Sequence, residues 1–200
     1  MMKDSCSILV IEDEMITATS IVELLKDEDY EVMGIARDAQ KALLMSNQAE
    51  TPPSIIICDI NIIGAIKGVE LAAQLKELYR CEIIFLTAYS DQKTLGGAFE
   101  LEPVMYVVKP FTDAQLLVAL QLGFHKMLKK STFSSTSILL LTEREKEIAH
   151  LVAHGLSSKQ IGRKLNISIE TVKTHRRRML SKNSIKNFPQ LVFLMQQTAV

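Results

Sequence analysis

Short apolar runs recur along the first part of the chain, each of them short enough to form a strand. They occupy residues 7–11, 31–36, 54–58, 82–86 and 105–108. Nearly continuous apolar residues are typical of strands covered on both faces. The segments between them carry apolar residues at helical spacing, as in Met15, Ala18, Val22 and Leu25, in Leu71, Leu75 and Leu78, and in Leu116, Leu117 and Leu120. Strands that alternate with helices predict a mostly parallel sheet with helices on both sides.

A different pattern occupies residues 141–180, LTEREKEIAHLVAHGLSSKQIGRKLNISIETVKTHRRRML. Thr142 with Glu145, and Ser157 with Gln160, have the spacing of helix capping boxes, and Gly155 is a natural helix stop. Apolar residues suited to a small core are Ile148, Leu151, Val152, Ile161, Leu165, Ile167, Val172 and Met179. Short helices joined by tight turns, the last of them basic and capped by Ser168, predict a helix-turn-helix. A basic helix that is merely solvated is the alternative interpretation.

Composition places the chain among ordinary globular proteins. It is 48% hydrophobic and 23% charged, and no apolar run reaches the roughly 20 residues of a membrane span. The start, MMKDSCSILVIEDE, lacks the features of a signal peptide. Cys6, Cys58 and Cys81 form no CxxC pair, which favours reduced, buried thiols. We therefore expect a cytoplasmic protein without membrane attachment.

The neutral net charge hides a division of the chain. Residues 1–130 hold 12 Lys/Arg against 19 Asp/Glu, whereas residues 131–200 hold 11 against 4. An acidic part joined to a basic part suggests a regulatory or catalytic module tethered to a polyanion binder. The segment KKSTFSSTS (129–137) is polar and serine-rich, as linkers are. We predict domains at 1–126 and 138–200, with a linker at 127–137.

Polar side chains follow four of the apolar runs. They are Glu12 and Asp13 after the first, Asp59 after the third, Thr87 after the fourth and Lys109 after the fifth. In an open parallel sheet these ends meet at one crevice, where ligands bind. Three clustered acids repel one another and favour a cation, and hard oxygen ligands favour Mg²⁺. A carboxylate beside such a metal can attack phosphorus, so Asp59 is the predicted nucleophile.

These landmarks resemble the receiver domain of two-component response regulators over residues 5–126. The resemblance implies a doubly wound, flavodoxin-like sheet of five parallel strands and phosphorylation of Asp59 by a histidine kinase. It implies Mg²⁺ bound by Asp13, Asp59 and the main-chain carbonyl of Asn61, with Glu12 acting partly through water. It also implies a cis Lys109-Pro110 peptide and phosphoryl contacts from Thr87 and Lys109.

Three further positions follow from the same resemblance. Tyr106 is expected to turn inward behind Thr87 on activation, although an ordinary half-buried aromatic is the alternative. Asn61 and Tyr89 are expected to flank the path of the water that removes the phosphoryl group. The loop after Asp59 departs from the family pattern, because it lacks proline and reaches Gly68 one residue late, so its kinase docking contacts are expected to differ from those of the family.

The basic part resembles the LuxR/FixJ/NarL helix-turn-helix over residues 138–197, giving a second, smaller all-α domain. Carried onto this chain, the expected base readers are Lys173, Thr174 and Arg177, and the expected phosphate contacts are Thr171, His175, Arg176 and Arg178. Gly162, Asn183 and the pair Phe188-Pro189 depart from the family pattern. Pro189 is tolerable only in the first turn of the final helix.

We therefore predict a response regulator transcription factor that binds double-stranded DNA as a homodimer and acts on RNA polymerase. It performs Mg²⁺-dependent self-phosphotransfer and slow autodephosphorylation but is not a turnover enzyme. One alternative is a haloacid-dehalogenase-like phosphohydrolase, although the Asp59-Ile60-Asn61 sequence and the lack of a cap disfavour it. The other alternative is an RNA-binding antiterminator, against which the TVKTH segment argues.

Overall fold

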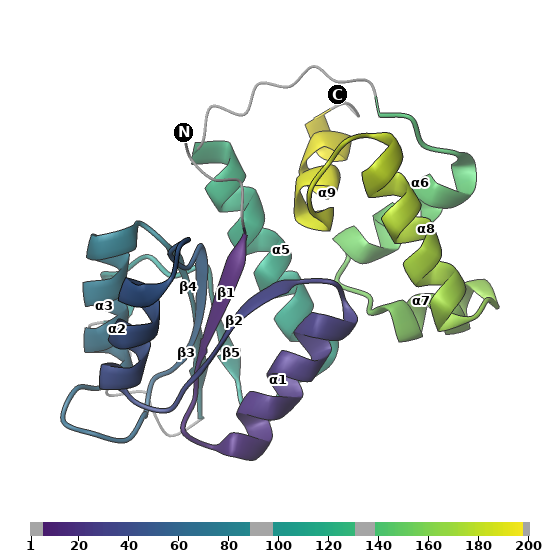
Figure 1. Ribbon diagram of the computed structural model, residues 1–200. Helices are drawn as coiled ribbons and strands as arrows, with labels where there is room; N and C mark the ends of the chain where they lie inside the picture. Colours follow the sequence, from purple (N-terminus) through teal and green to yellow (C-terminus); the bar gives the residue numbers. More distant parts are fainter. Residues whose placement is uncertain (1–5, 89–97, 131–138, 198–200) are drawn as a thin grey trace. The chain divides into compact units, whose positions relative to one another are not determined.

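The computed structural model describes residues 6–88, 98–130 and 139–197 (Figure 1). The chain forms two compact units, one ending at Phe111 and the other beginning at Thr112. No helix in these three ranges is long and apolar enough to cross a bilayer.

A parallel sheet forms the centre of the first unit. Its described strands are β1 (Ser7–Ile11), β2 (Glu31–Ala36), β3 (Ile55–Asp59), β4 (Glu82–Thr87) and β5 (Met105–Val108). Their order is β2-β1-β3-β4-β5, and every neighbouring pair is parallel. This order is the flavodoxin-like arrangement, so the predicted fold class is confirmed. β3 and β4 each extend one residue past their predicted ends, which brings Asp59 and Thr87 into the strands themselves.

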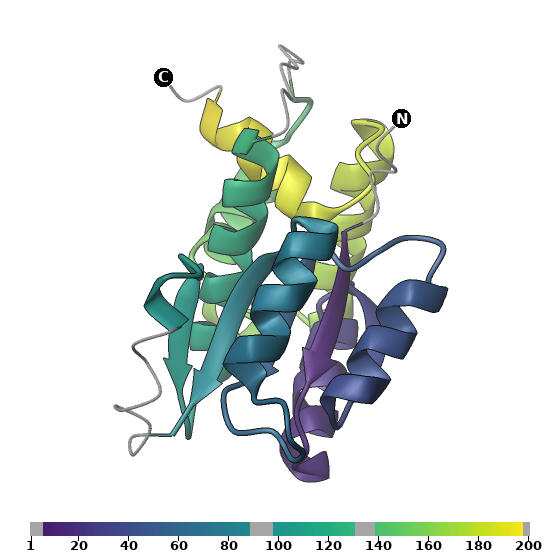
Figure 2. The same ribbon diagram turned by 90° about the vertical axis from the view of Figure 1, so that its left-hand side faces the viewer.

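Helices cover both faces of this sheet. Figure 1 shows α1 (Met15–Asp27) on one face and α2 (Ala39–Gln48) and α3 (Gly68–Tyr79) on the other. Figure 2 shows α2 and α3 lying over the strands from the front. The buried residues of α1 are Ala18, Ile21 and Leu25, whereas Met15 is 45% exposed. The buried face of α1 therefore includes Ile21 in place of the predicted Met15 and Val22.

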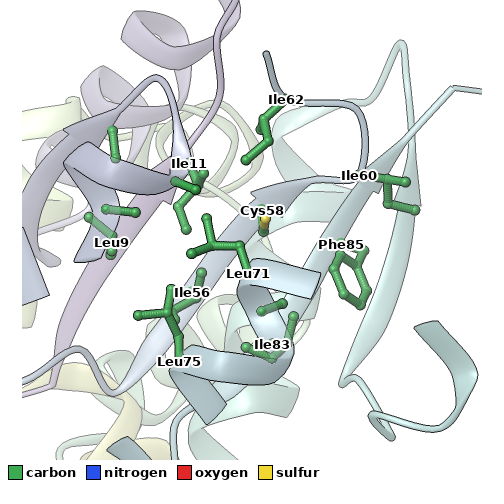
Figure 3. Packing of buried hydrophobic residues seen from close by; sticks show 14 of the residues in the cluster. Leu9, Ile11, Ile56, Cys58, Ile60, Ile62, Leu71, Leu75, Ile83 and Phe85 are labelled. Carbon is green, nitrogen blue, oxygen red and sulfur yellow. The ribbon is translucent and has the colours of Figure 1, made fainter. Parts of the chain in front are cut away.

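The core beneath α3 explains the uninterrupted isoleucines of the third strand. Leu71 and Leu75 of α3 pack against Ile56 and Cys58 of β3, with β1 and β4 side chains around them (Figure 3). Every residue of β3 is buried, including Asp59. Because both faces of β3 are covered, alternation of polar and apolar residues would place polar groups in the core.

The second unit is helical in its described residues. It contains α5 (Asp113–Lys130), α6 (Glu143–Ala153), α7 (Ser158–Leu165), α8 (Ile169–Lys182) and α9 (Phe188–Gln197). Both predicted capping boxes are present, at Thr142 and Ser157, and the Ser168 side chain caps α8. Pro189 lies in the first turn of α9, where it is tolerated. The predicted core residues Ile148, Val152, Ile161, Val172 and Met179 are buried together with residues of α9.

α5 belongs to the second unit in this division, although the sequence assigns it to the first domain. The rings of His125 in α5 and Phe193 in α9 lie 5.3 Å apart. The domain boundaries at 126 and 138 stay predictions.

Candidate phosphoacceptor site and nucleic-acid interface

The carboxyl ends of the strands hold the predicted polar residues in place through the hydrogen-bond ladder of the sheet. Glu12 N donates to Ala36 O at 3.0 Å, and Lys109 N donates to Thr87 O at 2.8 Å. Asp59 is paired with Leu86 of β4, and the ladder continues to Ile60 N, which donates to Leu86 O at 3.0 Å. The polar side chains therefore stand on rigid main chain rather than on loops.

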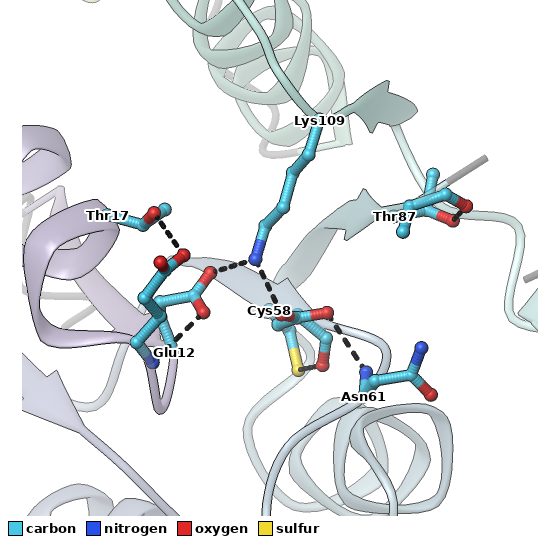
Figure 4. Close-up of polar contacts among 9 residues, drawn as sticks. Glu12, Thr17, Cys58, Asn61, Thr87 and Lys109 are labelled. Atoms are coloured by element: carbon cyan, nitrogen blue, oxygen red, sulfur yellow. Dashed lines mark hydrogen bonds and ion pairs between the residues drawn. The ribbon is translucent and has the colours of Figure 1, made fainter. Parts of the chain in front are cut away.

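Lys109 joins two of the carboxylates directly. Its Nζ lies 2.6 Å from Glu12 Oε2 and 2.6 Å from Asp59 Oδ2 (Figure 4). The Glu12 side chain is fully buried, whereas those of Asp59 and Lys109 are 11% and 21% exposed. Lys109 therefore neutralises buried acids at the centre of the crevice.

The pKa directions follow from this geometry. Burial raises the pKa of Glu12, the charge of Asp59 adds to the effect, and Lys109 opposes it only in part. Burial lowers the pKa of Lys109, but its hydrogen bonds and ion pairs with Asp59 and Glu12 outweigh burial and raise that pKa overall. The lysine is thus held as a cation beside an acid that resists ionisation.

A cation could be held beside the same lysine. Oxygen atoms of Glu12, Asp13 and Asp59 all lie within 4.8 Å of one another. Asn61 N donates to Asp59 Oδ1 at 2.9 Å, so the main chain two residues beyond Asp59 turns back to this carboxylate. Carboxylate oxygens are the ligands that Mg²⁺ prefers, so these residues fit such an ion.

Gly68 lets α3 begin directly against the main chain of Asp59. A Cβ at Gly68 would lie 1.9 Å from the carbonyl oxygen of Asp59, and Gly68 N donates to Ile60 O at 3.0 Å. The loop is one residue longer than the family pattern, and it ends at this close approach. Within this loop Gly64 has a φ of +115°, and Ile63 bridges to Asp38.

The predicted switch residues lie on neighbouring strands. Thr87 is buried, and its Oγ1 donates to Ala88 O at 3.1 Å. The ring of Tyr106 stacks on Phe85 at 5.7 Å and is tilted against Phe99 at 5.4 Å. The Tyr106 hydroxyl is buried without a hydrogen-bond partner among the described residues, and burial raises its pKa. Tyr106 is thus half-buried with a buried hydroxyl, and its movement behind Thr87 on activation stays a prediction.

Two other predictions about this crevice have different outcomes. The Lys109-Pro110 peptide is cis, as expected. Tyr89, predicted to flank the water path with Asn61, lies outside the described residues. Asn61 is exposed, so it is accessible to solvent two residues beyond Asp59.

In the second unit, α7 and α8 form the predicted helix-turn-helix. α7 ends at Leu165, Asn166 adopts a left-handed φ of 54°, and Ser168 caps α8. Gly162 allows this tight turn, because a Cβ there would lie 2.8 Å from Ile167 O.

Asn183, which also departs from the family pattern, connects the segment before α6 to the end of α8 through hydrogen bonds. Its Oδ1 accepts from Leu140 N at 2.7 Å, and its Nδ2 donates to Met179 O at 2.8 Å. An apolar residue at this position could not form the hydrogen bonds with Leu140 N and Met179 O.

Most of the predicted DNA-contacting residues are accessible on α8. Thr171, Thr174, Arg177 and Arg178 are exposed, and Lys173 and His175 are partly exposed. The exposed residues Lys159, Arg163 and Lys164 of α7 add positive charge that the prediction left out.

The prediction that Arg176 contacts a DNA phosphate is wrong for this structure. This residue is 1% exposed, and its guanidinium lies within the helical core, so it cannot contact a DNA phosphate in this conformation. Its position explains this result. Val172, Arg176 and Met179 follow one another at helical spacing and form the core-facing side of α8. That spacing is visible in the sequence, but the charge of Arg176 obscured it.

The fold and the crevice define the class of protein, a receiver-type domain joined to a helix-turn-helix domain. Residues 8–121 match the family described as "Response regulator receiver domain". Residues 139–195 match "Bacterial regulatory proteins, luxR family". The chain belongs to the response regulators that carry a receiver and a LuxR-type DNA-binding domain, and it is a response regulator transcription factor.

Individual relatives agree with this assignment along nearly the full chain. "Probable transcriptional regulator ycf29" of Pyropia yezoensis is 30% identical, covering 94% of this chain and 88% of the relative. "Transcriptional regulatory protein LiaR" of Bacillus subtilis is 29% identical, covering 92% and 93%. The solved structure of the response regulator StyR is 28% identical, covers 96% of this chain and 98% of that one, and has a TM-score of 0.52. A histidine kinase and DNA are the partners that such a domain pair implies.

Proposed function

We propose that Asp59 accepts a phosphoryl group from a histidine kinase and that this event controls DNA binding. The observation that carries the proposal is the position of Asp59, held between Lys109 Nζ at 2.6 Å and the Asn61 amide at 2.9 Å, with Glu12 and Asp13 nearby. A carboxylate so placed is fixed in direction and remains partly accessible.

The chemistry is a substitution at phosphorus. A carboxylate oxygen of Asp59 attacks the phosphorus of a phosphohistidine, the new O–P bond forms, the N–P bond breaks, and the imidazole leaves. When bound by Glu12, Asp13, Asp59 and the Asn61 carbonyl, Mg²⁺ supplies positive charge against the phosphoryl oxygens. Lys109 holds a phosphoryl oxygen by charge, and Thr87 donates a hydrogen bond after leaving Ala88 O.

The transfer is a single event on the protein itself, followed by slow hydrolysis, and not turnover of a free substrate. Hydrolysis needs a water molecule in line with the O–P bond, and the exposed Asn61 lies where it can influence its approach. We also propose that the protein acts on DNA in the cytoplasm. We further propose that it binds DNA as a homodimer and then acts on RNA polymerase, since dimers of helix-turn-helix domains read paired half-sites.

Labelling with a small phosphodonor tests the proposal. Acetyl phosphate should label the wild-type protein only in the presence of Mg²⁺, and the Asp59→Asn variant should not be labelled. Asp13→Asn should nearly abolish labelling by weakening the metal site, while leaving the nucleophile. Undiminished labelling of Asp59→Asn would show that the acceptor lies elsewhere. Multiple turnover of a free phosphate ester would instead favour a phosphohydrolase.

A further inference from the structure

One side chain of the recognition helix α8 faces inward although it carries a charge. Arg176 is 1% exposed, and Val172 and Met179, which lie on the same side of α8, are also buried. The next two residues, Arg177 and Arg178, are exposed. Of three consecutive arginines, the first therefore belongs to the protein interior and the other two to the surface.

Arg176 contacts both helices that flank α8 in the sequence. Its Nη1 donates to Ser158 Oγ at 2.9 Å, and Ser158 is the first residue of α7. Its Cζ lies 4.8 Å from the ring centre of Phe188, which is the first residue of α9. Ser158 and Phe188 are themselves buried, so both contacts are shielded from solvent.

Stability alone does not account for an arginine at this position. Removing a guanidinium from water is costly, and a well-packed apolar side chain of similar volume is often at least as stabilising. The amino-terminal end of α7 carries a positive partial charge, which disfavours a cation near Ser158. What arginine adds is direction, because its planar guanidinium can donate along fixed lines and stack on a ring at the same time.

We propose that Arg176 is a positioning residue for DNA recognition. Its contacts with Ser158 and Phe188 set the rotation of α8 about its own axis. Lys173 lies one turn before Arg176 on a neighbouring face, and Arg177 follows it directly, so their directions depend on this rotation. An apolar side chain would fill the same space but would let α8 turn between several packed positions. The inference rests on the DNA-binding function and on α8 as its reading helix.

The test compares two duplexes, because a positioning residue and a phosphate contact affect them differently. One duplex is selected from a random pool by the wild-type full-length protein treated with acetyl phosphate, and the other is its scrambled sequence. Arg176→Met keeps most of the volume and removes the directed contacts. We expect its affinity for the selected duplex to fall about tenfold, while its affinity for the scrambled duplex and its salt dependence stay unchanged.

Variants of the two partners separate positioning from general stability. Ser158→Ala leaves Arg176 in place but removes the hydroxyl that accepts from Arg176 Nη1, and it should lower the preference for the selected duplex in the same direction. The double variant Ser158→Ala/Arg176→Met should prefer the selected duplex as much as Arg176→Met does, because both changes break the same hydrogen bond between Arg176 and Ser158. Arg176→Lys should fail to restore the preference, since an ammonium cannot donate to Ser158 and stack on Phe188 with the same planar group.

Three outcomes would overturn the inference. Equal loss on both duplexes with a shallower salt dependence would make Arg176 a phosphate contact. If Arg176→Met fails to fold, Ser158→Ala decides, and an unchanged preference in that variant would make the proposal wrong. If the wild-type protein selects no duplex at all, the DNA-binding function fails, and the positioning role is refuted with it.

Discussion

Lys109 Nζ lies 2.6 Å from Asp59 Oδ2 and neutralises this carboxylate, the proposed phosphoacceptor. The same nitrogen lies 2.6 Å from Glu12 Oε2, so one lysine balances two buried carboxylates. A metal ion bound to these carboxylates would share its ligands with an existing positive charge. The crevice thus has a neutralising group whether or not a metal ion is bound.

Lys109→Gln should destabilise the protein and make its stability depend more strongly on Mg²⁺. Removing one partner of a buried ion pair should lower the free energy of unfolding by up to about 3 kcal/mol here. Larger losses are not expected, because Lys109 is 21% exposed and solvent screens part of the interaction. Mg²⁺ can replace the missing charge, so it should raise the thermal midpoint more in the variant than in the wild type. Melting curves in EDTA and in Mg²⁺ measure this, and equal Mg²⁺ effects in both proteins would contradict it.

Gly68→Ala should displace Asp59 through a clash with its main chain. The new Cβ would meet the main-chain oxygen of Asp59 at 1.9 Å, so either α3 or Asp59 must move, at a cost of about 3 kcal/mol or more. We expect labelling by acetyl phosphate to slow by at least about tenfold, since the direction of the carboxylate changes.

Gly64→Ala is the matched control for this prediction. Gly64 has a φ of +115°, and among the described residues no atom beyond its two chain neighbours lies within 4 Å of the point that a Cβ would occupy. Alanine there therefore strains the loop by about 1–3 kcal/mol without touching Asp59. Its labelling rate should stay close to wild type. Equal slowing in both variants would show that loop strain, not contact with Asp59, controls the rate.

The sequence was sufficient to predict the sheet and its reactive edge, because each depends on strong local patterns. Doubly covered strands need continuous apolar residues, and the ends of parallel strands necessarily meet. Asp59, Thr87 and Lys109 were therefore placed correctly at one edge. The direct bridge from Lys109 to Glu12 was not predictable in this way, since it depends on the side-chain conformation of a long lysine and on the depth of Glu12.

The recognition helix shows where local pattern and residue chemistry disagree. Arg176 has the helical spacing of a core residue and the charge of a surface residue, and only the positions of Ser158 and Phe188 show which property prevails. Contacts between helices, rather than spacing within one helix, fix this residue.

Glu145 should make the stability of the helical domain sensitive to acid. Its carboxylate pairs with Lys182 and accepts from Thr142 N at 2.8 Å. Burial raises the pKa of Glu145, but the hydrogen bonds from Lys182 and Thr142 outweigh burial and lower it below the ordinary 4.5. A lowered pKa means that the unfolded chain binds the proton more tightly, so the contribution is complete above pH 4.5 and is lost as pH falls through the folded pKa.

Glu145→Gln removes this pH-dependent contribution while keeping the capping geometry, since glutamine also suits this position. The wild type should be more stable than the variant by about 1–3 kcal/mol near neutral pH, and the difference should shrink below pH 4.5. Urea unfolding of both proteins at several pH values measures the difference. A gap that stays constant down to about pH 3, well below the ordinary carboxyl pKa, would contradict the role of the ionised carboxylate.

The last prediction concerns the two exposed arginines of α8. Arg177 and Arg178 are about 100° apart around the helix, so they cannot both face the floor of one groove. If Arg177 reads a base edge, Arg177→Ala should cost about 1–3 kcal/mol on the selected duplex and blur preference at one or two base pairs. If Arg178 binds a phosphate, Arg178→Ala should weaken all duplexes alike.

Salt dependence separates these two roles without a structure of the complex. Loss of one phosphate contact should lower the slope of log affinity against log salt by about 1 per subunit, because one fewer counterion is released. Arg178→Ala should show this change, and Arg177→Ala should not. Measurements on selected and scrambled duplexes at several salt concentrations give both quantities. If the two variants lose equal affinity on both duplexes with equal slopes, Arg177 is not a base reader, and recognition must come from other residues such as Lys173 or Thr174.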